Sequence, residues 1–122
     1  MEDRDPLTER IIASCYSVHN VLGPGFNEKI YHNVFMLDFD QEGLKYETEK
    51  RFEVYYQNNK VGKLIVDLVV EGKVIVEVKA ITGNIPDIFK YQVLSYLRVS
   101  NLKVGLLVNF GRKSCLVKRL IF

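Results

Sequence analysis

The stretch Ile65–Lys79, IVDLVVEGKVIVEVK, decides the fold of this 122-residue chain. It predicts two β-strands around a short turn at Glu71-Gly72, because β-branched, apolar residues lie on both sides of that turn. Side chains alternate along a strand, so the three valines of VIVEVK point to one face and Glu77 and Lys79 share the other. Both faces are otherwise apolar, which predicts a central strand covered on both sides. A carboxylate and an ammonium there are costly to bury unless they are paired or bind a metal, which indicates a functional site.

Asp67, on the first of these strands, completes the pattern D-(x)9-E-x-K with Glu77 and Lys79. A strict two-residue turn would pair Asp67 with Val76 and turn it away from Glu77. A three-residue loop, Glu71–Lys73, or a β-bulge brings the two carboxylates opposite each other, and we predict such an irregularity.

A divalent cation relieves the repulsion between two carboxylates that meet, and oxygen ligands favour Mg²⁺ or Mn²⁺. A bound cation lowers the pKa of its water and stabilises charge on a phosphoryl oxygen. A nearby lysine can orient or deprotonate that water, or stabilise the phosphate in the transition state. The pattern therefore contains the parts needed for metal-assisted phosphodiester hydrolysis.

The other elements follow from hydrophobic spacing and from turn residues. We expect a helix from Asp5-Pro6 to Gly23-Pro24-Gly25, a helix capped by Asn27 that ends near Gly43, and then strands, turns and a third helix. Their expected ranges are a strand over 45–56, a turn at 58–59, strands over 63–70 and 73–80, a helix over 87–99, and strands over 102–110 and 114–121. The order α-α-β-β-β-α-β-β predicts one α/β domain over residues 1–122, with a mixed β-sheet flanked by helices.

The net charge of +2 hides an asymmetry along the chain. Residues 1–80 hold 10 Lys/Arg against 14 Asp/Glu, whereas residues 81–122 hold 7 Lys/Arg against a single Asp. The basic C-terminal third is either a surface for a phosphate backbone or a solvated face, and charge alone leaves both open. No apolar run is long enough to span a bilayer and the acidic start is unlike a signal peptide, so we expect a cytoplasmic protein. Cys15 and Cys115 have no metal-ligand spacing, and we expect reduced, partly buried thiols.

Several motifs resemble a known family. Gly25–Tyr31, GFNEKIY, resembles the motif that names the GxxExxY proteins, and the D…E-x-K element between helices resembles the PD-(D/E)XK nuclease superfamily. The stretches VHNVLGPG, VEVKA, QVLSYL and GLLVNFG also fit, in order, over nearly the whole chain. The resemblance implies a restriction-endonuclease-like αβββαβ core with an extra N-terminal helix and an extra C-terminal strand.

The resemblance also implies roles for individual residues. The implied catalytic set is Asp67, Glu77, Lys79, Glu28, Gln92 and Tyr96, and the implied metal ligands are Asp67, Glu77, Glu28 and the carbonyl of Val78. The implied cofactor is Mg²⁺ or Mn²⁺, and the implied partner is nucleic acid, either DNA or RNA. Gln92 and Tyr96, at i and i+4, share one helix face.

Some residues have a second, structural interpretation. Glu28 lies in the first turn of its helix, where a carboxylate suits the dipole. For His19 a structural place at a helix end is favoured over metal binding, and a metal site that joins His32 to Glu28 is a weak alternative. The aromatic residues of the 45–56 strand fit sheet packing better than base stacking; they are Tyr46, Phe52, Tyr55 and Tyr56.

Two function classes stay open beside a metal-dependent nuclease. One is a catalytically inactive nucleic-acid-binding module on the same fold, and the other is a regulatory or interaction protein. The apolar last strand favours an edge that pairs with a second subunit, so a homodimer is possible from the sequence.

Overall fold

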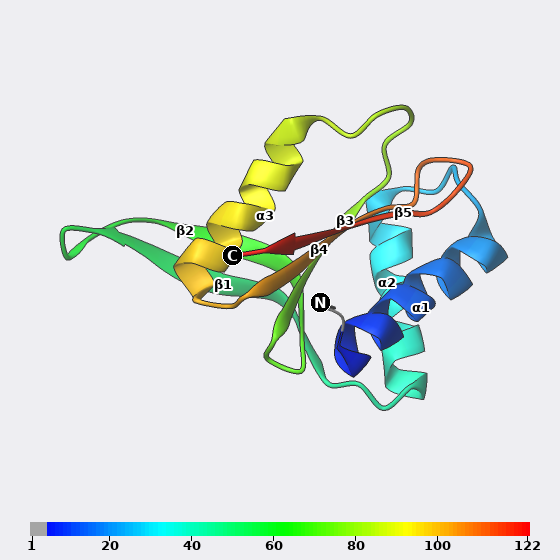
Figure 1. The fold of residues 1–122 in the computed structure, drawn as a ribbon, viewed down its shortest axis with the longest axis horizontal. Helices are drawn as coiled ribbons and strands as arrows, with labels where there is room; N and C mark the ends of the chain where they lie inside the picture. The colour runs from blue at the N-terminus through cyan, green and yellow to red at the C-terminus, as the bar shows by residue number, and fades with distance from the viewer. Residues whose placement is uncertain (1–4) are drawn as a thin grey trace.

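The computed structural model describes residues 5–122, and Figure 1 shows its helices and strands in the predicted order. The elements are α1 (Pro6–Leu22), α2 (Glu28–Gln41), β1 (Tyr46–Tyr56), β2 (Asn59–Val70), β3 (Val74–Lys79), α3 (Asp87–Ser100), β4 (Val104–Asn109) and β5 (Leu116–Ile121). None of the helices in this part of the chain is long and apolar enough to cross a membrane.

The five strands form one sheet in the order β1-β2-β3-β4-β5. Neighbouring strands are antiparallel except β3 and β4, which run parallel because α3 carries the chain back between them. Helices α1 and α2 lie on one face of the sheet and α3 on the other (Figure 1). The predicted mixed sheet flanked by helices is confirmed, and the arrangement is restriction-endonuclease-like.

Helix ends follow from local sequence. Asp5 caps α1 by accepting a hydrogen bond from the N–H of Thr8 at 2.8 Å, and Pro6 takes the first helical position, where no N–H is needed. Asn27 caps α2 by accepting the N–H of Ile30 at 3.1 Å. The Asn27 cap fixes where α2 begins and so places Glu28 in the first turn of that helix.

Two apolar cores enclose β3. The valines at 74, 76 and 78 pack with α1 and α2 around Tyr31 and Phe35, whereas Ile75 packs with Val93 and Leu97 of α3. Strand β3 is therefore the central strand covered on both sides, as predicted. Both cysteines are buried and free, as expected for reduced thiols.

The β1–β2 hairpin is longer than expected. β2 begins at Asn59 rather than at residue 63, and the turn falls at Gln57–Asn58, where both residues have positive φ (48° and 65°). Sequence reasoning missed the first part of β2 because Asn59–Gly62 lacks apolar alternation. The sheet-packing interpretation is wrong for Tyr55 and Tyr56, which are exposed because the hairpin extends beyond both cores. It holds for Tyr46 and Phe52, which are partly buried against the two cores.

Candidate functional site

The loop between β2 and β3 has the predicted irregularity. Val70 pairs with Val74, so the loop is Glu71–Lys73, three residues long rather than two. Glu71 and Gly72 both have positive φ (55° and 65°), which closes this loop tightly. The register brings Asp67 opposite Glu77, although the two strands separate after the pair Leu68–Val76.

Side chains replace the backbone ladder at the point where β2 and β3 separate. Asp67 Oδ2 accepts the N–H of Val78 at 2.8 Å, and Glu77 Oε1 accepts the N–H of Asp67 at 3.3 Å. Each carboxylate thus satisfies a backbone donor of the opposite strand. The second oxygen of each carboxylate makes no hydrogen bond to any residue in the range 5–122, so one oxygen per carboxylate keeps its lone pairs without a donor.

Glu77 carries an unusual proton affinity. The residue is only 5% exposed, and its pKa is raised from the ordinary 4.5 to about 8. Burial is the largest cause and the charge of Asp67 the next, with a smaller contribution from Glu28, whereas the Asp67 N–H and Lys79 lower the pKa. A buried acid beside a second acid is the environment that a cation would stabilise.

Lys79 follows Glu77 on the same face of β3 and points towards α3. Its ammonium lies 4.3 Å from the ring centroid of Phe89, a cation–π contact. It forms no ion pair with Glu77 among the described residues, so its charge acts on Glu77 from a longer distance. A half-buried lysine held in this way presents its ammonium near the carboxylates without neutralising either directly.

The α3 residues differ in how firmly the structure links them to this site. The pKa of Tyr96 is raised to about 12, first by burial and then by the charges of Glu77 and Asp67, so its hydroxyl keeps its proton at neutral pH. Gln92 is half-buried one turn earlier on the same helix. Its side chain makes no hydrogen bond within residues 5–122. Gln92 thus shares a helix face with Tyr96, but no hydrogen bond links it to the acids.

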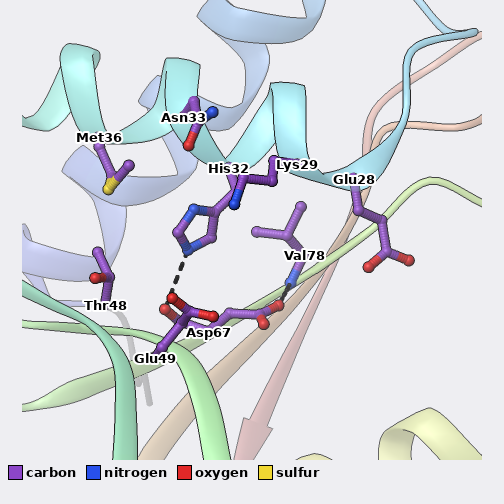
Figure 2. A pocket seen from close by; sticks show the side chains of 9 residues that line it. All are labelled: Glu28, Lys29, His32, Asn33, Met36, Thr48, Glu49, Asp67 and Val78. Atoms are coloured by element: carbon purple, nitrogen blue, oxygen red, sulfur yellow. Dashed lines mark hydrogen bonds between the residues drawn. The ribbon is translucent and has the colours of Figure 1, made fainter.

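A pocket of about 350 Å³ lies between α2 and the strands, and Asp67 and Val78 are among the residues that line it. Figure 2 shows these side chains beneath α2. Glu28 lies at the Val78 end of the pocket, so this exposed side chain faces the site while it also occupies the first turn of α2. His32, one turn further on, reaches into the pocket, and its Nε2 lies 3.2 Å from the carbonyl oxygen of Asp67. Glu28 therefore lies both in the first turn of α2 and at the edge of the pocket, and a role in metal binding stays a prediction.

The two histidines have different environments. His19 is buried, its Nε2 lies 2.8 Å from the carbonyl oxygen of Arg112, and its ring stacks on Phe110. Its favoured structural role is confirmed. His32 contacts the backbone of Asp67 rather than a group of metal ligands, so the weak His32–Glu28 metal alternative finds no support in the geometry.

Sequence reasoning missed two residues around this site. Glu49 lines the pocket and sits opposite Asp67, where β1 breaks its pairing and takes φ of 47°. The alternation of side chains between the two faces of the sheet also breaks on β2. Val66 packs under α3 whereas Leu68, two residues on, packs under α1 and α2. No local signal predicts a left-handed glutamate inside a strand.

Asn109, the second missed residue, fixes the chain that leaves β3 after Lys79. It is fully buried, accepts the N–H groups of Ile81 at 2.8 Å and Gly111 at 3.0 Å, and donates to the carbonyl of Ile81 at 2.9 Å. Its position at the end of a buried strand was a usable signal, because buried amides need several partners.

The donor set favours a two-carboxylate cation site. Among residues 5–122, no group of three His, Cys, Asp or Glu side chains is close enough to hold a metal ion. Asp67 and Glu77 nevertheless offer two hard oxygen donors beside the backbone of Val78, which is the chemistry that Mg²⁺ and Mn²⁺ accept when water completes the shell.

Comparisons with known proteins found similarity over most of the described chain. A sequence model of the PD-(D/E)XK nuclease superfamily matches residues 5–120, and no curated protein matches. Among solved structures, the fold is similar to that in the crystal structure of SSO0001, with 20% identity and a TM-score of 0.60. That likeness covers 93% of this chain and 56% of the other, so this chain spans little more than half its length and the two share a fold alone. With its family match, sheet order and D…E-x-K strand pair, the chain belongs to the PD-(D/E)XK nuclease superfamily.

Proposed function

We propose that this chain is a nuclease that uses Mg²⁺ or Mn²⁺ to hydrolyse phosphodiester bonds, and that within the superfamily it is a GxxExxY protein. Members of the superfamily generally use divalent metal ions and act on nucleic acid. The observation that carries the proposal is the apposition of Asp67 and Glu77 across β2 and β3, with Lys79 on the same face of β3. The motif Gly25–Tyr31, which starts α2 beside the pocket, supports the narrower family.

In this proposal Asp67, Glu77 and the Val78 carbonyl hold the cation, with Glu28 reaching it through the pocket. A cation bound there would supply a water of lowered pKa and positive charge for a phosphoryl oxygen. Because the Asp67 and Glu77 carboxylates are each anchored by a backbone N–H, their remaining oxygens are fixed before a ligand arrives.

Lys79 and the α3 residues act on the reacting phosphate. Lys79, beside the two acids, would orient the attacking water or balance charge on the phosphate. Tyr96 keeps its proton at neutral pH, since its pKa is about 12, and can therefore donate a hydrogen bond to a phosphate oxygen. Gln92, on the same helix face, is proposed to line the same side of the substrate.

A second candidate is a nucleic-acid-binding module that no longer cuts. It is favoured by the lack of a three-residue group of metal ligands in the described chain. The two candidates differ in whether Lys79 matters for turnover and whether a divalent ion is needed at all.

A cleavage assay tests the proposal on single- and double-stranded DNA and RNA, with Mg²⁺, with Mn²⁺ and with EDTA. Cleavage should require a divalent ion and fall at least a hundredfold in Lys79→Ala and Asp67→Asn, as expected for groups that stabilise transition-state charge. Lys73→Ala, which changes an exposed lysine in the β2–β3 loop, is the matched control and should cut normally. Binding without cleavage would favour the second candidate, and cleavage that survives Lys79→Ala would contradict both the site and the mechanism.

A further inference from the structure

The β1–β2 hairpin projects past α3, away from the rest of the molecule (Figure 1). We call residues 51–65 the ribbon. One face of the ribbon carries Phe52, Val54 and Leu64, which are half-buried, and Phe52 packs against the core under α3. The opposite face is exposed and, because a hairpin of this length has no core behind that face, its side chains are available to a partner.

The exposed face of the ribbon is defined by register and by contacts. Arg51 lies opposite Ile65, Glu53 opposite Lys63, and Tyr55 opposite Lys60. The Lys60 ammonium is 2.8 Å from Glu53, and the Tyr55 hydroxyl donates to the same carboxylate at 2.9 Å. Lys60 thus balances the charge of the one acid on this face of the ribbon, and Tyr55 adds a hydrogen bond to it.

The remaining charge on this face is positive. Arg51 and Lys63 form no ion pair within residues 5–122, so both heads are available to an anion. Around them lie the apolar parts of Tyr55, 58% exposed, and Ile65, 47% exposed. Cationic heads mixed with apolar surface fit a polyanion with apolar parts between its phosphates, which is a nucleic acid.

The same face leads to the candidate site. Glu49 and Asp67, which line the pocket, lie two residues beyond Arg51 and Ile65 on β1 and β2, before the alternation of β2 breaks between Asp67 and Leu68. A partner lying along this face therefore runs into the pocket beside Asp67. This continuity favours nucleic acid over a second copy of the chain as the occupant.

We propose that the ribbon docks in the major groove of a DNA duplex that lies across the site, with Arg51 and Lys63 against its phosphates. This inference rests on the proposed function for the identity of the substrate. The major groove of B-form DNA admits a two-stranded β-ribbon, whereas the groove of duplex RNA is too narrow and deep. From Asp67 to Asn59 the strand extends at most roughly 26 Å, at about 3.3 Å per residue. At about 3.4 Å per base pair, the ribbon reaches roughly eight base pairs from the site.

Binding of a fluorescein-labelled DNA duplex of about 20 base pairs tests the proposal, with Ca²⁺ in place of Mg²⁺ so that binding is read without turnover. The double variant Arg51→Glu/Lys63→Glu should bind at least tenfold more weakly than the wild type. The slope of log K against log salt should fall by about 2 in Arg51→Gln/Lys63→Gln, as for two lost phosphate contacts. The matched control is Lys73→Glu/Lys103→Glu, which makes the same charge change on exposed residues away from the ribbon and should weaken binding less than threefold.

The outcomes separate this inference from the proposed nuclease function. Three results would overturn the ribbon proposal. They are an equal loss of DNA affinity in the ribbon and control variants, tighter binding to single strands or duplex RNA than to duplex DNA, and no binding of duplex DNA. A change of sedimentation coefficient in the ribbon variants would also overturn it, because it would identify a subunit interface. If the wild type binds duplex DNA without cutting it, and only the ribbon variants lose that binding, the ribbon proposal is supported and the nuclease proposal is contradicted.

Discussion

The carboxylate of Glu77 accepts a hydrogen bond from the backbone N–H of Asp67, while the carboxylate of Asp67 accepts one from the strand of Glu77, at Val78. The two acids are thereby held together at the point where their strands part. Without a cation, burial and then the charge of Asp67 raise the pKa of Glu77 to about 8. This relationship makes three measurable quantities depend on Glu77: stability, proton release and metal affinity.

The metal-free protein should lose stability as pH rises. Glu77 has a folded pKa of about 8, above the ordinary value of 4.5, so the folded state holds a proton that the unfolded chain releases between these two values. The free energy of unfolding therefore falls through that window, by an amount on the order of a few kcal/mol. Urea unfolding in EDTA, at steps from about pH 5 to about pH 9, measures it.

Glu77→Gln is the matched variant for this stability experiment, because the amide keeps the shape and cannot ionise. Its unfolding free energy should vary less with pH than that of the wild type and exceed it near pH 9. Glu42→Gln, at an exposed acid, should follow the wild-type curve. A wild-type curve that rises through the window would show that Glu77 is ionised in the folded state.

Metal binding at neutral pH should release close to one proton. The metal-free site holds Glu77 protonated at pH 7, and a cation needs the carboxylate in its charged form, so the proton leaves as the metal enters. Calorimetric titration with Mn²⁺ in two buffers of different ionisation enthalpy gives the number directly. The release should vanish near pH 9, where Glu77 is already ionised, and Glu77→Gln should bind Mn²⁺ at least tenfold more weakly. Equal heats in both buffers at pH 7 would contradict the assignment.

The sequence predicted the order of elements and the strand pair because both depend on local alternation and turn residues. It also predicted an irregular turn, either a three-residue loop or a bulge, since the requirement that Asp67 meet Glu77 leaves few registers, and the structure has the three-residue loop. It did not predict the left-handed φ of Glu49, because that conformation is imposed where β1 bends around Asp67. Nor did it predict the length of the ribbon, since Asn59–Gly62 has no apolar pattern and is held in the strand by its pairing with β1 alone.

His32 is expected to position Asp67. Its Nε2 lies 3.2 Å from the Asp67 carbonyl oxygen, and the ring reaches from α2 into the pocket (Figure 2). His32→Ala should lower Mn²⁺ affinity severalfold, because Asp67 loses a fixed backbone, and should cost about 1 kcal/mol of stability for the lost hydrogen bond. His32→Gln, which can still donate to this carbonyl, should restore much of the affinity. Loss of stability with unchanged Mn²⁺ affinity would assign His32 to the fold alone.

Gly111 is expected to be irreplaceable, for a reason that leads back to Lys79. A Cβ at this position would lie 2.3 Å from the nitrogen of Ile81 and 2.5 Å from the carbonyl carbon of Ala80, both backbone atoms of the segment that leaves β3. Since Asn109 holds that segment through Ile81, neither side can move without breaking buried hydrogen bonds. Gly111→Ala should therefore destabilise the protein by about 2 kcal/mol or more in urea unfolding.

Gly62→Ala is the stability control, because an added Cβ there meets nothing within 4 Å and φ is not positive. Its unfolding free energy should stay within about 0.5 kcal/mol of the wild type. If the folded fraction of Gly111→Ala also cuts more slowly than the wild type, the contact between Gly111 and the 80–81 segment positions Lys79, two residues before Ile81. Equal rates would confine that contact to stability.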